Sequence, residues 1–384
     1  MAAPPPPRPQ TIVCLNFGGI GDQILFSPVL SAVRRAVPEA RLTFVTEKRC
    51  AAVMGLLPQV DDTRFIVVRQ GFRLMLFVEL LLMLWQLKPD AVISSGTSPF
   101  IAILLWLSGA RIRIGYNSHR FLTGLLSRAA PLGFDMYAGQ MYFSLAATFL
   151  EELDLPMSQI NTWIPELYAY GDRHAVLQDA LEKATHTDEA RVWRYRIFIH
   201  PGVSRVSVKK GILKAWDPLN WAELIHRLIG SHPDWQVVLL GGPDDHEDID
   251  AILSAMERLG GQEAVKHPQF VNFFGLTESL TDLASVLTMG TMLVSVDSGP
   301  MHLAVGLKIP LVALFSPTSE RKLLPPVPWV QAVHVDDLPC RPCLFDVRQQ
   351  SCNQPVCLDI PVDKVMAGVE SMMVQLGHLE PAQS

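Results

Sequence analysis

The chain has 384 residues, of which 49% are hydrophobic and 18% are charged, and its formal net charge is -6 at pH 7. This length exceeds what one hydrophobic core usually supports, so we expect two domains of roughly 150 to 200 residues each. The composition is that of a folded globular protein. The negative charge balance argues against a general attraction to nucleic acid, and no nucleic-acid partner is expected.

The N-terminal segment, residues 1–10, is rich in proline and lacks the apolar central run of a secretory signal. We therefore predict a disordered tail over these residues and a cytoplasmic protein.

From Thr11 onward, short β-branched runs alternate with helical ones. A helix is expected over Asp22–Val37. Strands are expected at Thr11–Phe17, Arg41–Thr46, Arg64–Val68, Ala91–Ser94 and Arg111–Gly115. This alternation predicts parallel strands joined by right-handed crossovers, hence an α/β domain.

Two strongly apolar segments, Leu74–Leu87 and Phe100–Leu107, interrupt this pattern. Both are too short for a bilayer span, which needs about 20 apolar residues. Their length favours buried or half-buried helices. Docking on a membrane surface is the alternative, and the second run adds some weight to it.

The second half repeats the plan, with strands expected at Arg196–His200, Gln236–Leu240, Phe270–Phe274, Met292–Val296 and Leu311–Phe315. Residues 164–194 lose strand character, so the domain boundary belongs there. We predict an N-terminal domain over residues 11–175, a C-terminal domain over residues 176–361, and a C-terminal helix and tail over residues 362–384.

A glycine turn, Gly18-Gly19-Ile20-Gly21-Asp22, follows the first expected strand. Open α/β sheets bind ligands beyond the carboxyl ends of their strands, and glycines let the backbone approach a ligand closely. Asp22 is then either a functional carboxylate or merely the N-cap of the helix. The spacing is not Gly-x-Gly-x-x-Gly, which disfavours a nicotinamide site.

A second polar turn, Asp297-Ser298-Gly299-Pro300-Met301-His302, joins a buried strand to a helix in the second half. Backbone N–H groups at a helix start form an anion site suited to a diphosphate, so we place a nucleotide here. Asp297 as a plain cap and His302 as a buried polar residue remain the alternatives. Another polar turn, residues 316–319, follows the next strand. Two polar turns beyond adjacent strands favour a pocket at this edge of the sheet.

Together these segments resemble glycosyltransferase family 9, whose best-known members are the ADP-heptose:lipopolysaccharide heptosyltransferases. The resemblance runs from about Thr11 to Leu376. Its signatures are Gly19-Ile20-Gly21-Asp22, Arg113-Ile114-Gly115-Tyr116, His200-Pro201-Gly202, Lys214-Ala215-Trp216, Gly241-Gly242-Pro243 and the Asp297–His302 block.

The resemblance implies a GT-B fold, in which two Rossmann-like domains with parallel sheets face each other across a cleft. It further implies an inverting, metal-independent transfer of a sugar from a sugar nucleotide, plausibly heptose from ADP-heptose, to a lipopolysaccharide-type or other glycan acceptor. Such an enzyme is cytoplasmic or peripheral to the cytoplasmic face of the inner membrane, and its acceptor is lipid-linked or a polysaccharide.

The resemblance also assigns roles to residues. Asp22 is the base that deprotonates the acceptor, and Lys214 contacts the donor phosphates, with Lys209 and Lys210 as rivals. The full expected donor set is Gly21, Ser204, Lys214, Asp245, Asp297, Ser298, Gly299, His302 and Thr318. Gly19 and Arg120 are expected on the acceptor side. Asp244 and Glu247 stay open as alternatives to Asp245.

Two other functions remain open at this stage. One is a GT-B-like sugar-nucleotide epimerase or hydrolase that uses the donor pocket without an acceptor. The other is a non-catalytic sugar-nucleotide-binding protein that kept the fold, against which the presence of Asp22, Lys214 and Asp297 speaks.

Four of the six cysteines cluster in the sequence, namely Cys340, Cys343, Cys352 and Cys357. They are enough for a tetrahedral structural zinc, and the first pair has a familiar metal spacing while the second does not. Disulfides and free thiols are the alternatives, although a cytosolic setting argues against stable disulfides.

Overall fold

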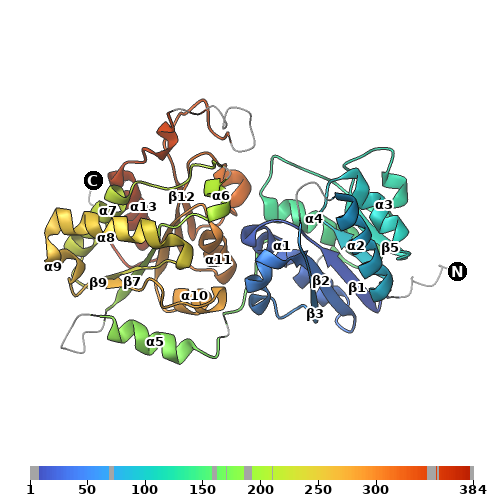
Figure 1. Ribbon diagram of the computed structural model, residues 1–384, viewed down its shortest axis with the longest axis horizontal. Helices are drawn as coiled ribbons and strands as arrows, with labels where there is room; N and C mark the ends of the chain where they lie inside the picture. Colours follow the sequence, from blue (N-terminus) through green and yellow to red (C-terminus); the bar gives the residue numbers. More distant parts are fainter. Residues whose placement is uncertain are drawn as a thin grey trace. The chain divides into compact units, whose positions relative to one another are not determined.

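A computed structural model describes residues 8–68, 73–157, 162–169, 171–185, 193–209, 211–343, 352 and 354–380. The chain divides into two compact units, Met1–Tyr168 and Ala169–Ser384 (Figure 1). The sequence predicted a division after residue 175. The helix α5 (His174–Lys183) belongs to the second unit because His174 Nδ1 lies 2.8 Å from Ser285 Oγ on α10 (Leu280–Leu287).

The first unit is built on a six-stranded sheet in the order β3-β2-β1-β4-β5-β6. All neighbouring pairs are parallel. The strands are β1 (Thr11–Leu15), β2 (Arg41–Glu47), β3 (Asp62–Ile66), β4 (Ala91–Ser94), β5 (Ile112–Tyr116) and β6 (Arg128–Ala130). The chain order reverses direction between β1 and β4, which is where open α/β sheets bind ligands.

Helices cover both faces of this sheet. On one face α1 packs on α4, and Phe26 of α1 stacks on Phe44 of β2 with ring centroids 5.7 Å apart. Val45, the next residue of β2, points to the other face and joins the core under α2 and α3. The helices are α1 (Ile20–Ala36), η1 (Lys48–Leu56), α2 (Arg73–Leu87), α3 (Pro99–Leu107), η2 (Thr123–Leu125) and α4 (Ala138–Glu152).

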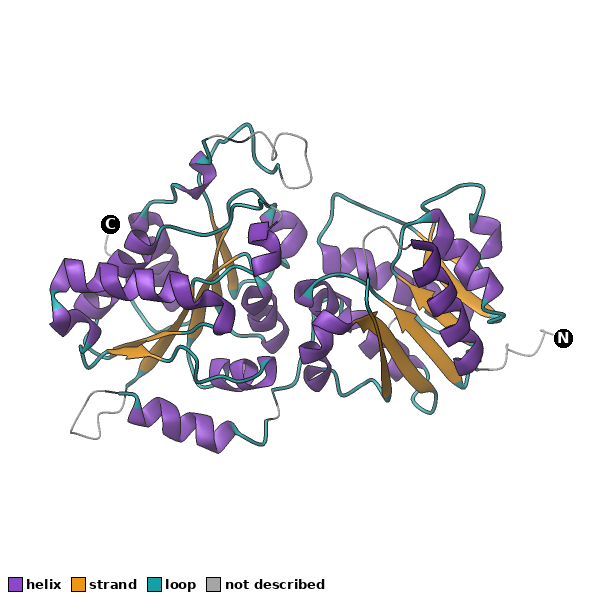
Figure 2. Cartoon of the chain, viewed as in Figure 1, coloured by secondary structure: helices purple, strands orange, loops and turns teal. Residues whose placement is uncertain are grey.

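The second unit repeats the design with a parallel sheet in the order β12-β11-β10-β7-β8-β9. The strands are β7 (Tyr195–His200), β8 (Trp235–Leu239), β9 (Phe270–Asn272), β10 (Met292–Val296), β11 (Leu311–Leu314) and β12 (Val330–Val333). Both units are therefore three-layered α/β structures, with strands between helices (Figure 2). This is the α/β class that the sequence predicted.

One face of the second sheet is covered by α7, α8 and the C-terminal helix α13, which bury Trp221, Trp235 and Met372. Trp216 fastens the chain before α13, because its Nε1–H donates to the carbonyl of Ile360 at 3.0 Å. The helices of this unit are α5, α6 (Arg205–Lys209), α7 (Pro218–Ser231), η4 (Pro243–Asp245), α8 (His246–Gly260), α9 (Gln262–Val265), α10, α11 (Gly299–Leu307), α12 (Glu320–Leu323), η6 (Val356–Leu358) and α13 (Val362–Gln375).

The central strands are continuous apolar runs, as strands covered on both faces require. The strands β6 and β12 were not predicted, because they are short edge strands with the mixed sequences RAA and VQAV. None of the helices in the described ranges combines the length and the hydropathy needed to cross a membrane.

Candidate active site

Asp22 lies in the first turn of α1, directly beyond the carboxyl end of β1. The helix begins at Ile20, so Asp22 is its third residue and not the N-cap, a position taken by Gly19. The Gly19 N–H donates to Asp22 Oδ2 at 2.7 Å. A Cβ atom on Gly18 would lie 2.4 Å from the same oxygen, so only glycine fits there. The glycine turn thus wraps the carboxylate closely.

The other carboxylate oxygen of Asp22 faces α4. Tyr142 donates its hydroxyl to Asp22 Oδ1 at 3.3 Å. The Tyr142 ring is buried and packs edge-on against Phe26 of α1, with centroids 5.7 Å apart. Burial and the nearby Asp22 carboxylate both hold the pKa of Tyr142 well above its usual value. The phenol is therefore a donor, and it holds a half-exposed carboxylate from a segment 120 residues away.

Beneath Asp22 the turn is tied to the sheet by Asn16, which follows β1. Its side-chain amide donates to the backbone carbonyl of Asp22 at 3.1 Å and to Gln23 Oε1 at 3.0 Å. Cys50 donates its thiol to the carbonyl of Gly18 at 3.1 Å, and burial raises the pKa of that thiol to about 11. Cys50 is thus a structural thiol, and the turn is fixed on both sides.

In the second unit, an ion pair with little solvent exposure lies at the carboxyl end of β10. Lys214 Nζ is 2.7 Å from Asp297 Oδ2, and the side chains are 13% and 4% exposed. A largely buried cation is retained where an anion pairs with it. The structure therefore brings together two of the residues that the resemblance assigned to the donor side.

Two buried hydroxyls accompany this ion pair. Ser298 Oγ, at the N-cap of α11, and Thr318 Oγ1, in the turn after β11, have no hydrogen-bond partner within the described ranges. The strands that precede them are adjacent in the sheet. Buried donors left without partners are unfavourable by about 1–3 kcal/mol each, so such groups are expected to bind a ligand or water. Beside them, the first N–H groups of α11 have no intrahelical partners.

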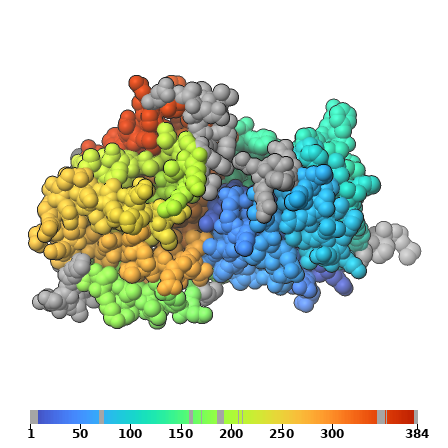
Figure 3. Space-filling view, in the orientation of Figure 1, coloured from blue at the N-terminus to red at the C-terminus, as the bar shows by residue number. Residues whose placement is uncertain are grey.

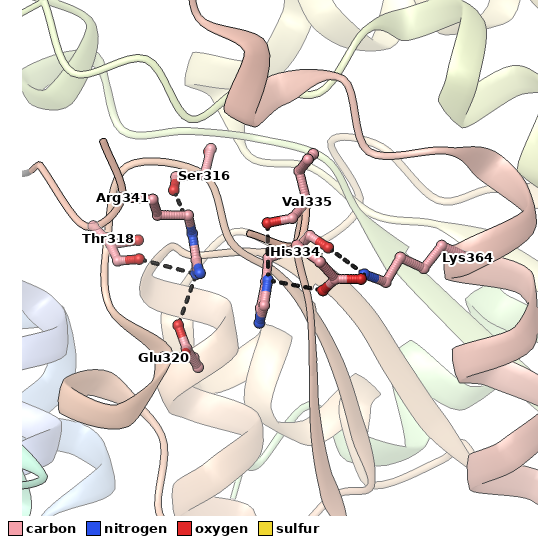
Figure 4. A network of polar contacts seen from close by, with 8 residues as sticks. Ser316, Thr318, Glu320, His334, Val335, Arg341 and Lys364 are labelled. Atoms are coloured by element: carbon pink, nitrogen blue, oxygen red, sulfur yellow. Dashed lines mark hydrogen bonds and ion pairs between the residues drawn. The ribbon is translucent and has the colours of Figure 1, made fainter. Parts of the chain in front are cut away.

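The turn that carries Thr318 is held in place by Arg341, a residue the sequence analysis did not single out. Its guanidinium donates to the carbonyls of Ser316 and Thr318 at 2.8 and 3.1 Å, and it pairs with Glu320 at 2.7 Å (Figure 4). Three contacts from one side chain fix the backbone of this turn. No local motif signals the role, because the partners lie more than 20 residues away.

Asp245 has a different setting from its neighbours. Its Oδ2 accepts from the Gly242 N–H at 2.8 Å and lies 3.7 Å from His200 Nε2, and both side chains are buried. Burial lowers the pKa of His200, so the imidazole is neutral. Asp244 is exposed and pairs with Arg205 at 3.1 Å. The structure therefore places Asp245 under the turn at Gly202, where it caps η4.

The remaining candidate residues differ in solvent exposure. Ser204 is exposed before α6, where its hydroxyl accepts from the Ser207 N–H at 3.2 Å. Lys209 and Arg120 are also exposed, and His302 is buried on α11. Lys210 lies outside the described residues.

The cysteine cluster does not form a set of metal ligands where the structure describes it. Cys340 and Cys352 are exposed, and Cys357 is buried. Over the described ranges, no group of three or more histidine, cysteine, aspartate or glutamate side chains is arranged to hold a metal ion. Residues 344–351 and 353 lie outside the described residues. Burial, followed by the nearby Cys343, Cys352 and Cys340, raises the pKa of the Cys357 thiol to about 11, so the four cysteines lie in one neighbourhood. The structural zinc stays a prediction.

Comparison with known proteins fits this geometry. A sequence model described as "Glycosyltransferase family 9 (heptosyltransferase)" matches residues 83–354. The chain belongs to that family. A relative, the lipopolysaccharide heptosyltransferase 2 of Salmonella typhimurium, is 37% identical over 318 residues, which cover 80% of this chain and 83% of the relative. The resemblance read from the motifs is confirmed, and the protein is a glycosyltransferase of the heptosyltransferase family.

Solved structures of family members share the fold. The E. coli ADP-heptose lps heptosyltransferase II has a TM-score of 0.67 at 21% identity, with 96% of this chain and 99% of that chain covered. An E. coli heptosyltransferase with ADP-2-deoxy-2-fluoro heptose has a TM-score of 0.61 at 18% identity, covering 94% and 99%. The predicted GT-B fold class is confirmed.

Proposed function

We propose that this protein transfers a heptose from ADP-heptose to a lipopolysaccharide-type or other glycan acceptor, with inversion at the anomeric carbon. The observation that carries the proposal is the largely buried Lys214–Asp297 pair, together with the hydroxyls of Ser298 and Thr318, which have no partner within the described ranges. The lysine is cationic and the two hydroxyls are hydrogen-bond donors, which is the chemistry that a nucleoside diphosphate requires. The identities of the sugar and the nucleotide are taken from the family, because the relatives are named for heptose and one solved structure holds an ADP-heptose analogue.

On the donor side, we assign the diphosphate to Lys214, Ser298, Thr318 and the first N–H groups of α11. The positive end of the helix and the lysine ammonium stabilise the charge that develops on the leaving diphosphate. These groups supply positive charge without a metal ion, and the proposed reaction uses no cofactor. Asp297 holds the lysine in place until the donor binds. Gly299 allows the phosphate to approach the backbone, and His302 lies one turn further along α11.

On the acceptor side, we assign the role of general base to Asp22. Its carboxylate takes the proton of the acceptor hydroxyl, and the hydroxyl oxygen forms the new bond to the anomeric carbon. The bond between that carbon and the diphosphate oxygen breaks, and ADP leaves with the electron pair. Gly19 and Arg120 are the residues we place near the acceptor. A cytoplasmic enzyme at the inner face of the inner membrane would meet a lipid-linked acceptor there.

The donor assignment is tested by titration calorimetry with ADP, with UDP as a comparison nucleotide. We expect ADP to bind, and Lys214→Met to weaken its binding about 10- to 100-fold, as expected for loss of a hydrogen bond to a charged group. The double variant Lys214→Met with Asp297→Asn removes the buried unpaired carboxylate and must show the same loss.

Lys209→Met is the matched control, because Lys209 is an exposed lysine five residues earlier in the chain. Unchanged ADP affinity in both Lys214 variants, or an equal loss in Lys209→Met, would remove Lys214 from the donor site. Consumption of ADP-heptose at the same rate with and without an acceptor would favour the epimerase or hydrolase.

A further inference from the structure

The outer surface of α2 and α3 carries a concentration of exposed apolar side chains. Leu74 is 77% exposed, and Phe121, in the loop after β5, is 96% exposed. The other members of this surface are Met75, Val78, Leu82, Trp85, Phe100 and Trp106, each between 45% and 60% exposed. We call these eight residues the apolar face.

The apolar face follows the helical repeat of α2. Leu74, Val78, Leu82 and Trp85 recur every three or four residues and so lie on one side of the helix. Leu80 and Leu84, on the opposite side, are buried against the sheet. Solvent-facing sides of surface helices are normally polar, whereas Glu79 is the one charged residue between Leu74 and Leu87. The helix is thus apolar on both sides, although only one side has a partner among the described residues.

Neighbouring contacts join α2 and α3 into one surface. The rings of Phe77 and Phe100 are 6.5 Å apart, and Trp85 donates its Nε1–H to the carbonyl of Leu107 at 2.8 Å. The two helices lie side by side in the first unit, and Figure 3 shows the surface, from blue to cyan, to which they contribute.

The charge around the apolar face opposes that of the whole chain. Residues 73–128 hold six lysines and arginines against two acidic residues, a balance of +4, whereas the full chain has a net charge of -6. Lys88 directly follows α2, Arg111 lies shortly after α3, and Arg120 adjoins Phe121, and all three are exposed. Cations flanking an exposed apolar helix are complementary to an anionic lipid surface.

We infer that the apolar face of α2, α3 and Phe121 docks the protein on the surface of an anionic lipid bilayer. Aromatic and aliphatic side chains enter the boundary between headgroups and acyl chains, Trp85 and Trp106 lie at that boundary, and the flanking cations meet lipid phosphates. This docking deepens the proposed function, because a lipid-linked acceptor is found at such a surface. It rests on the proposed function in that respect alone.

Sedimentation of the full chain with vesicles tests this inference without donor or acceptor, so its outcome is independent of the proposed activity. The probes are vesicles of phosphatidylglycerol with phosphatidylcholine, and vesicles of phosphatidylcholine alone. We expect binding to the anionic vesicles, weaker binding to the neutral ones, and a decrease with added salt. Leu74→Gln with Leu82→Gln should lower the partition coefficient at least about tenfold, because two apolar side chains no longer leave water.

The matched control is Leu219→Gln with Leu259→Gln, which changes two leucines of the second unit that are 49% and 50% exposed. All four positions are exposed, so thermal unfolding should be nearly unchanged in both double variants. Equal vesicle binding by the Leu74/Leu82 variant and wild type would overturn the inference, as would absence of binding by wild type. A concentration-dependent dimer that the Leu74/Leu82 variant abolishes, without vesicle binding, would instead identify the face as a contact between copies of the chain.

Discussion

At the scale of single residues, the same local arrangement occurs twice with different exposure. Asp22 accepts from the Gly19 N–H, and Asp245 accepts from the Gly242 N–H, each three residues earlier in a glycine turn. Asp22 is half-exposed and keeps one oxygen toward Tyr142, whereas Asp245 is 7% exposed. Capping and catalysis are therefore compatible at Asp22. The two carboxylates differ in solvent exposure, which the sequence motif does not determine.

Tyr142→Phe tests whether the buried phenol positions the proposed base. The hydroxyl donates to Asp22 Oδ1 at 3.3 Å, so its loss removes a contact that holds the carboxylate beside α4. We expect kcat to fall about 3- to 30-fold, as for the loss of one hydrogen bond to a charged group, with ADP affinity unchanged. The measurements are kcat for heptose transfer and the dissociation constant of ADP.

Tyr116→Phe is the control, because Tyr116 is also buried and its hydroxyl donates to the carbonyl of Met141 at 3.1 Å, not to Asp22. A kcat of Tyr142→Phe within twofold of wild type, or an equal loss of kcat in Tyr116→Phe, would show that the Tyr142 hydroxyl does not position Asp22.

Most of the candidate residues lie in short sequence motifs, and the rest are identified only by long-range contacts. Asp22 and the residues from Asp297 to His302 lie where a strand is followed by the start of a helix, so the sequence alone points to them. Lys214 came from the family pattern, and its partner Asp297 is 83 residues away. Tyr142 and Arg341 could not be found in this way, because their roles depend on which helices and turns the fold brings together.

At the scale of elements, the terminal helix α13 is a structural part of the second unit. Val365, Val369, Met372 and Met373 are fully buried in the core with Trp221. We expect Met372→Ala to lower the free energy of unfolding by about 2–5 kcal/mol, through lost burial and a residual cavity. Urea unfolding followed by tryptophan fluorescence measures this change.

Glu370→Ala is the control on the exposed side of the same helix. A surface substitution of this kind should change the unfolding free energy by less than about 0.5 kcal/mol. Equal effects of the two substitutions would show that α13 does not pack as described.

Element type was predictable where an apolar run was long enough and lay in the sheet interior. The strands β1, β4 and β10 were placed to within two residues, because both of their faces are buried. The edge strands β6 and β12 were not, since their short mixed sequences become strands only by pairing with β5 and β11. For α2, the length of the run predicted a buried or half-buried helix, and periodicity alone could not show that one apolar side stays exposed.

At the scale of the whole molecule, length and strand alternation predicted two α/β units, and the GT-B class came from the family resemblance. The division itself depends on long-range contacts: Arg173 pairs with Asp282 at 2.7 Å, which assigns the segment before α5 to the second unit. Charge also differs along the chain, with the basic stretch 73–128 set within an acidic protein. Such a contrast is visible in sequence, but its position beside exposed apolar side chains is not.

The proposed reaction is heptose transfer with Asp22 as the base. The most direct measurement is transfer of heptose from ADP-heptose to a lipopolysaccharide-type acceptor, in buffer with EDTA, by wild type and Asp22→Asn. Asparagine keeps an oxygen for the Gly19 N–H but accepts no proton, and Asp217→Asn, at the N-cap of α7, controls for a lost capping carboxylate. We expect transfer by wild type and by Asp217→Asn, and a turnover about 100- to 10,000-fold lower in Asp22→Asn with ADP affinity unchanged. Turnover of Asp22→Asn within about threefold of wild type, or wild-type turnover that requires an added metal ion, would contradict it.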